Sequence, residues 1–130
     1  MNERTDLRDA TVGQVLIPVR DLPRAIEFYR NTLGVPFLFE APPQMSFFQA
    51  GSVRLLVGVP EPASATAGSA VYFKVADIHA VHRTLVERGA RFSSAPHRVH
   101  RTATSELWLA ELSDPDGNVL ALMAEVAVQT

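Results

Sequence analysis

Hydrophobic and polar positions along the chain predict a strand, a helix and three further strands, and then the same order again. Residues 12–19 are apolar and rich in β-branched side chains, which is typical of a strand. Asp21 and Pro23 favour the start of a helix, which the helical spacing of apolar residues continues until Gly34. The three strands that follow are predicted over residues 36–40, 46–50 and 53–59.

The second copy of the pattern begins after residues 60–68, whose proline, alanine, serine and glycine content we interpret as a linker. Residues 71–75 predict a strand, and Asp77 is expected to cap a helix that ends at Gly89. A loop is predicted over residues 96–106. The remaining predictions are strands at residues 91–94, 106–112 and 119–126, with a turn at residues 114–117.

The two halves also match at the junction between strand and helix. Residues 19–22 read VRDL and residues 75–78 read VADI, and each helix ends in glycine after a similar length. Such an internal repeat predicts two copies of one unit that cannot bury its sheet alone. The chain is therefore divided into a tail (1–11), a first module (12–59), a linker (60–68), a second module (69–126) and a C-terminal tail (127–130).

Composition narrows the classes of function. The 130 residues carry a formal net charge of −2, which gives no electrostatic basis for binding nucleic acid or an anionic membrane surface. The chain has no cysteine, so disulfides and cysteine-bound metal centres are excluded. It also has no apolar run of the roughly 20 residues that a membrane helix needs, and no secretory signal. We expect a cytoplasmic protein without a nucleic-acid or membrane partner.

Three motifs resemble one known family. Residues 19–34, VRDLPRAIEFYRNTLG, resemble the opening of vicinal oxygen chelate proteins, the superfamily of glyoxalase I, bleomycin-resistance proteins, fosfomycin-resistance enzymes and extradiol dioxygenases. Residues 72–78 and the DPDGN turn at 114–118 resemble its later motifs. The resemblance covers nearly the whole chain. It implies an α+β fold of two βαβββ modules that form a curved mixed sheet around a cavity, with the helices outside, and it implies a homodimer.

The resemblance also implies where a metal would be bound. Such proteins hold a divalent ion that chelates two substrate oxygens, and the ligand positions correspond here to Gln14, Ala70, Ala121 and one of residues 54–57. Of these, Gln14 alone is a usable ligand, and divalent sites need several anionic or imidazole donors. We therefore expect no metal and no other cofactor, as in the bleomycin-resistance branch, whose members bind a drug in the dimer cleft.

Strand alternation predicts which side chains face the cavity. The predicted cavity lining is mostly apolar with a few polar side chains, which suits a mostly apolar or aromatic small molecule with one or two hydrogen-bonding groups. Trp108 belongs to it only if its face of the strand is the concave one; otherwise it is a core or dimer-interface residue. Of Phe47 and Phe48, one must face each way. The predicted ligand-binding residues are Gln14, Leu16, Tyr72, Trp108, Val119 and Met123.

The histidines are the remaining candidates for catalysis or metal binding. His97 and His100 in the predicted loop, with Glu106, are the catalytic candidates if the protein is an enzyme, because imidazole titrates near neutral pH. Arg98 and Arg101 beside them could clamp an anion, although an exposed loop of mixed polarity explains the same residues. His79 and His82 lie three residues apart on the second predicted helix, where a solvated helix side explains them better than a metal site.

Three functions are compatible with these patterns. The first is a metal-free small-molecule-binding protein, of the resistance or sequestration kind. The second is a lyase, isomerase or epimerase that uses the histidines without a metal. The third is a glyoxalase-type metalloenzyme, which requires ligands that the motifs do not supply.

Overall fold

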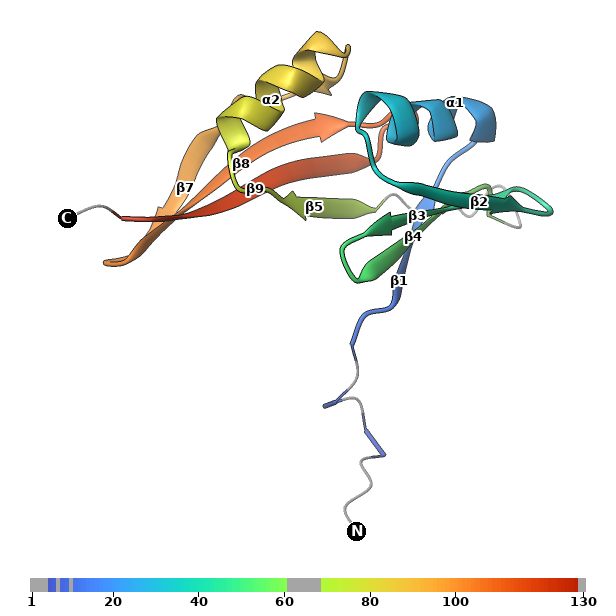
Figure 1. The fold of residues 1–130 in the computed structure, drawn as a ribbon, viewed down its shortest axis with the longest axis horizontal. Helices are drawn as coiled ribbons and strands as arrows, with labels where there is room; N and C mark the ends of the chain where they lie inside the picture. The colour runs from blue at the N-terminus through green and yellow to red at the C-terminus, as the bar shows by residue number, and fades with distance from the viewer. Residues whose placement is uncertain (1–4, 7, 10, 61–68, 129–130) are drawn as a thin grey trace.

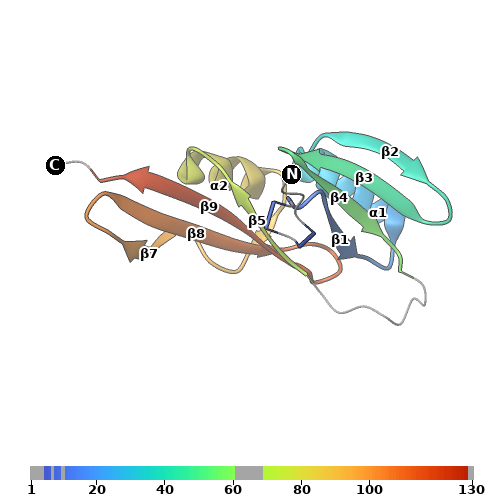
Figure 2. The ribbon, with the colours of Figure 1, turned by 90° about the horizontal axis from the view of Figure 1, so that it is seen from below.

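The computed structural model describes residues 5–6, 8–9, 11–60 and 69–128, so the predicted linker falls outside the described residues except for Pro60. The chain forms two α+β modules, each with a helix on one side of a mixed sheet (Figure 1). Both helices lie on the same side of the two sheets, and a view from below shows the strands in front of them (Figure 2). The predicted fold class and the predicted repeat of strand, helix and strands are confirmed.

The first module contains a four-stranded sheet in the order β1-β4-β3-β2, with β1 and β4 parallel and the other pairs antiparallel. Asp21 caps the helix by accepting a hydrogen bond from the Arg24 amide at 3.2 Å. The single helix predicted here changes after Glu27 into a π-helical turn. The elements are β1 (Gln14–Pro18), α1 (Leu22–Glu27), η1 (Phe28–Thr32), β2 (Phe37–Ala41), β3 (Met45–Ala50) and β4 (Val53–Gly58).

The second module repeats this plan with one strand more than the sequence predicted. Its sheet has the order β5-β9-β8-β6, and β7 also pairs with β8. The prediction of a loop at residues 96–106 was wrong, because β7 lies there. All five β7 residues are exposed, so the strand lacks the apolar alternation that a half-buried strand would show. The elements are β5 (Ala70–Lys74), α2 (Ile78–Glu87), β6 (Arg91–Phe92), β7 (His97–Arg101), β8 (Ser105–Ser113) and β9 (Val119–Ala127).

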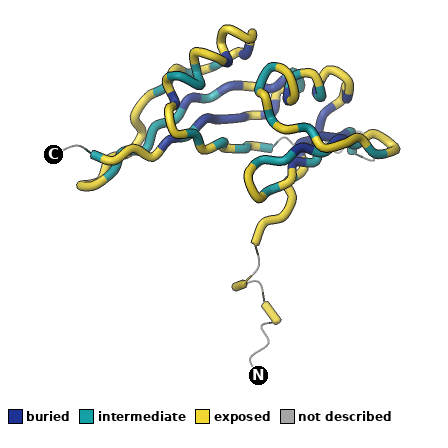
Figure 3. Tube along the Cα trace, in the orientation of Figure 1, coloured by how far each residue is buried: buried dark blue, intermediate teal, exposed yellow. Residues whose placement is uncertain are grey.

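The hydrophobic core lies between the helices and the sheets (Figure 3). Ile17, Phe48 and Leu55 fill it in the first module, and Leu112 and Leu120 fill it in the second, all at 2% exposure or less. Strand alternation places the neighbouring residues on the opposite faces, which no helix covers. The core therefore uses one side of each sheet and leaves the other side open.

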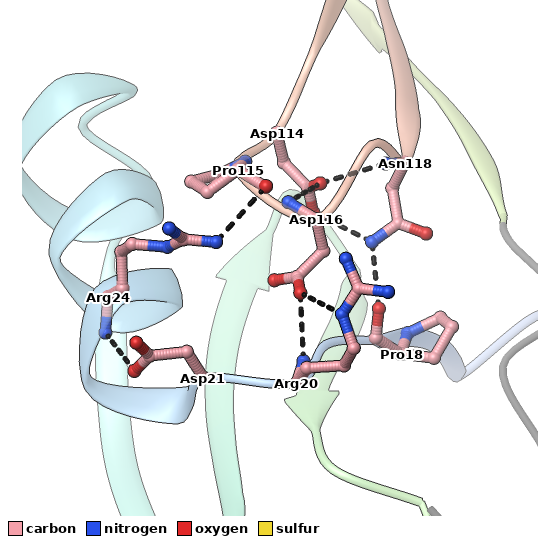
Figure 4. Close-up of polar contacts among 8 residues, drawn as sticks. All are labelled: Pro18, Arg20, Asp21, Arg24, Asp114, Pro115, Asp116 and Asn118. Atoms are coloured by element: carbon pink, nitrogen blue, oxygen red, sulfur yellow. Dashed lines mark hydrogen bonds and ion pairs between the residues drawn. The ribbon is translucent and has the colours of Figure 1, made fainter. Parts of the chain in front are cut away.

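The two modules are joined where the β8–β9 turn rests on the junction between β1 and α1 (Figure 4). The buried carboxylate of Asp114 organises the turn: its Oδ1 accepts the amides of Asp116 and Asn118 at 2.9 and 2.8 Å. Its Oδ2 accepts the Asn118 side-chain amide and the hydroxyl of Tyr29, both at 2.8 Å. Tyr29 belongs to η1, so this carboxylate bonds to both modules at once.

Further contacts cross the same junction. The Asn118 side-chain amide donates to the Pro18 carbonyl at 2.8 Å, and Asp116 Oδ1 accepts the Arg20 amide at 3.0 Å. The Arg20 side chain also pairs with Asp116 at 3.3 Å, and the Arg24 guanidinium donates to the Pro115 carbonyl at 3.2 Å. The VRDL and DPDGN motifs thus contact each other, and their polar residues join the modules.

Replacing Tyr29 with phenylalanine is expected to destabilise the fold by about 1–3 kcal/mol, because a buried carboxylate loses one of its donors. Chemical denaturation with urea measures the free energy of unfolding. Tyr72→Phe is the matched control, since Tyr72 is 50% exposed and its ring lies on an uncovered face. Equal stability of Tyr29→Phe and the control would contradict the role assigned to this hydroxyl.

Stability is also expected to fall above about pH 10. Burial, and after it the charge of Asp114, raises the pKa of Tyr29 far above its usual value. The unfolded tyrosine therefore ionises at high pH while the folded one keeps its proton, so the folded state binds more protons. The free energy of unfolding should then decrease with pH by up to about 1.4 kcal/mol per pH unit from this group. In Tyr29→Phe the decrease should be shallower, and identical slopes would show that Tyr29 does not contribute.

Candidate ligand-binding faces

The uncovered side of the first sheet carries a mixture of apolar and polar side chains. Leu16 and Phe39 remain 47% and 46% exposed there, and the rings of Phe39 and Phe47 lie 4.7 Å apart. Phe48 points into the core, so Phe47 is the ring that faces outward. We call this surface the first open face; by strand register it comprises Gln14, Leu16, Phe39, Met45, Phe47, Gln49, Arg54 and Leu56.

The uncovered side of the second sheet also exposes apolar side chains. Tyr72 and Val119 are 50% and 44% exposed. At its edge Lys74 and Glu125 form an ion pair at 3.1 Å. We call this surface the second open face; by register it comprises Ala70, Tyr72, Lys74, His97, His100, Leu107, Leu109, Glu111, Val119, Ala121, Met123 and Glu125.

A cleft of about 520 Å³ lies between the modules, lined by Val12, by residues of β1, β3 and β4 with Gly51 of the β3–β4 turn, and by all of β5. Of the predicted ligand-binding residues, Tyr72 lines it. Gln14 and Leu16 belong to the first open face, and Val119 and Met123 to the second. Within one chain the predicted lining is therefore divided between two surfaces.

Trp108 lies on the face of β8 that α2 covers. Its ring contacts the His79 ring at 5.3 Å in an edge-on arrangement, and its indole nitrogen donates to Glu106 Oε1 at 3.1 Å. Of the two orientations that the sequence left open, the structure has the one in which Leu109, and not Trp108, faces outward. Period-two alternation predicted which residues share a face, but not which face the helix would cover.

The structure brings two of the three catalytic candidates onto one face and places the third on the other. His97 and His100 pair with Leu109 and Leu107 and so share the second open face. Glu106 lies on the opposite face of β8, where Arg98 and Arg101 approach its carboxylate at 3.2 and 3.7 Å. The two arginines are thus occupied by an internal carboxylate.

The described contacts of the histidine rings are with a backbone carbonyl and with aromatic rings. His97 Nδ1 lies 2.7 Å from the Ala95 carbonyl oxygen. The His82 ring packs edge-on against Phe92 at 4.4 Å, as His79 does against Trp108. The α2 histidines therefore contact aromatic rings of the second module, while His79 remains exposed and His82 half-buried, in keeping with the partly solvated helix side that the sequence indicated.

Strand register locates the implied metal-ligand positions. Ala121 lies opposite Tyr72 in the second sheet, as Leu56 lies opposite Leu16 in the first. The position sought among residues 54–57 is therefore Leu56, and the set becomes Gln14, Leu56, Ala70 and Ala121. Three of these side chains have no donor atom, and within the described ranges no group of three or more His, Cys, Asp or Glu could hold an ion. These residues do not fit a divalent metal.

Comparison with known proteins decides the family. Residues 11–122 match the model described as Glyoxalase/Bleomycin resistance protein/Dioxygenase superfamily. The chain belongs to this superfamily. No curated protein sequence matches this superfamily member.

Across the described residues, no helix has the length and apolar character to cross a membrane.

Solved structures of the superfamily agree in fold. A member from Sphaerobacter thermophilus DSM 20745 is 28% identical, with a TM-score of 0.73 over 88% of this chain and 97% of that one. TnmS3, an antibiotic binding protein from Streptomyces sp. CB03234, is 25% identical, with a TM-score of 0.72 over 88% and 95%. Lactoylglutathione lyase from Agrobacterium tumefaciens, at 20% identity and a TM-score of 0.72 over 88% and 93%, shows the fold alone.

Replacing Trp108 with phenylalanine is expected to raise the pKa of Glu106 toward its usual range. The indole hydrogen bond is the largest influence that lowers this pKa, and Arg98 adds to it. Titration of the carboxyl carbon by NMR measures the shift. Leu109→Ala, on the opposite face of β8, is the control and should leave the titration unchanged. An unaltered midpoint in Trp108→Phe would contradict this assignment.

Proposed function

We propose that this superfamily member binds a mostly apolar or aromatic small molecule on its open faces, without a metal, as a sequestration or resistance protein. The observation that carries the proposal is that one surface combines too few metal donors with exposed apolar side chains. Of the four implied metal-ligand positions, Gln14 is the one whose side chain could bind a metal. The surface around Gln14 exposes large apolar side chains.

The energetics of the first open face favour an apolar ligand. Each Å² of apolar surface removed from water contributes about 25 cal/mol. Leu16 and Phe39 are nearly half exposed, so a ligand seated on them would bury surface that the fold itself leaves in water. The neighbouring rings of Phe39 and Phe47 offer a surface on which a planar ring system can stack.

The relative TnmS3, an antibiotic binding protein at 25% identity, supports the proposal of small-molecule binding.

A second copy of the chain is the partner we propose. Because the predicted lining is divided between two open faces, a homodimer that brings one copy's first open face against the other's second open face would reunite it.

The other two functions gain no support from the geometry. An acid–base enzyme that combines Glu106 with the histidines is not favoured, because Glu106 faces the opposite side of the sheet from His97 and His100. A metalloenzyme would need donors at Leu56, Ala70 and Ala121, whose side chains have none.

Calorimetry with the neutral planar probe 9,10-anthraquinone-2-carboxamide tests the proposal. We expect binding that persists after dialysis against a chelator. Phe47→Ala should weaken it by roughly threefold to tenfold, the loss expected for one aromatic contact. Trp108→Phe, on the covered face, is the matched control and should bind as the wild type does. Absence of binding up to the solubility limit of the probe, or its loss on chelation, would overturn the proposal.

A further inference from the structure

We propose that the ligand of the first open face carries a carboxylate, and that Arg54 binds it with the help of Gln14 and Gln49. This inference rests on the proposed function and gives its ligand a chemical class: a planar aromatic acid. It follows from how two neighbouring rows of side chains are arranged across the sheet.

The first row is polar. Arg54 on β4 pairs with Gln14 on β1 in the parallel register and with Gln49 on β3 in the antiparallel register. Paired residues point to the same face, and adjacent strands lie about 4.8 Å apart, so the side chains of Gln14 and Gln49 start on either side of the Arg54 side chain. The Gln49 side-chain amide donates to the Gly51 carbonyl at 2.7 Å, which fixes the orientation of that side chain.

The second row is apolar and lies next to the first on the same face. Phe39 pairs with Phe47, Phe47 pairs with Leu56, and Leu56 pairs with Leu16. Residues two apart along a strand are separated by roughly 6.6 Å, about the length of one aromatic ring with its substituent. A planar molecule stacked on Phe47 would therefore place a substituent on the polar row.

The first open face itself favours a negatively charged substituent. Arg54 is the sole charged residue of the first open face, while the whole chain is weakly acidic. Other arginines, such as Arg20 and Arg98, have a carboxylate within 3.3 Å. The described contact of the Arg54 guanidinium is with the Phe47 ring, 5.4 Å from its centroid, and no described carboxylate pairs with it.

An arginine in this setting is suited to an incoming carboxylate. Guanidinium presents its donors in a planar fork that matches the two carboxylate oxygens, and such charge-assisted bonds are about twice as strong as neutral ones. Contact with Phe47 holds the guanidinium against the surface on which the aromatic part of the ligand would stack. Gln14 supplies a further donor for an oxygen that the fork leaves free.

A pair of probes of equal shape tests the inference: 9,10-anthraquinone-2-carboxylate and the neutral 2-carboxamide. By calorimetry, wild-type protein should bind the carboxylate about 10- to 100-fold more tightly, the range for a hydrogen-bonded charge. Arg54→Met should abolish this preference while it keeps the affinity for the carboxamide. Arg30→Met is the matched control, because Arg30 also lies over a phenylalanine ring, Phe37 at 4.9 Å, but does not belong to the first open face.

Two further variants keep the test decisive if Arg54→Met does not fold, as judged by circular dichroism. Arg54→Lys should retain part of the preference, since it keeps the charge without the fork, and Gln14→Leu should reduce it. Equal wild-type affinity for the two probes would overturn this inference and leave the proposed function standing. A preference that survives Arg54→Met would also overturn it. Failure of both probes to bind would overturn the proposed function as well.

Discussion

The arrangement of the two modules depends on one buried carboxylate. Asp114 accepts four hydrogen bonds, three from its own turn and one from Tyr29 in the other module. A buried charge is tolerated because every bond it would make to water is replaced. The short turn between β8 and β9 therefore does more than reverse the chain: it fixes how the second sheet sits against the first, and so the relative position of the two open faces.

Several residues of the family motifs lie at this junction. Arg20 and Arg24 on one side meet Asp116 and Pro115 on the other, and Asn118 donates to the carbonyl of Pro18, just before the first motif. Contacts that build the fold and residues that bind a ligand can thus be separate sets. Hydrocarbon side chains occupy three of the four metal-ligand positions that the family resemblance implies, and Arg54, the one cation of the first open face, pairs with the fourth, Gln14. We infer that a guanidinium attracts an oxygen anion at this place.

Much of the fold could be predicted from the sequence, and there are physical reasons why the remaining features could not. Strands with a buried face, such as β4 and β9, are rich in apolar residues and can be predicted from them; β7 has one apolar residue in five, because all of its residues are exposed. Alternation placed Gln14 with Leu16 and Tyr72 with Ala70 on common faces. It could not decide the side on which α2 would pack, and so left the orientation of Trp108 open. The sequence also could not show that Gln49, Arg54 and Gln14 form one row, because register between distant strands is a tertiary property.

We propose that an organic molecule, and not a metal ion, occupies the surface around Gln14. A crystal structure of the protein purified from cell extract, with anomalous scattering data, would decide between the two. We expect planar organic density against Phe47 and Leu16, with an oxygen group at Arg54 and no anomalous peak beside Gln14. An ion coordinated by Gln14 together with water or a partner's side chain would contradict it.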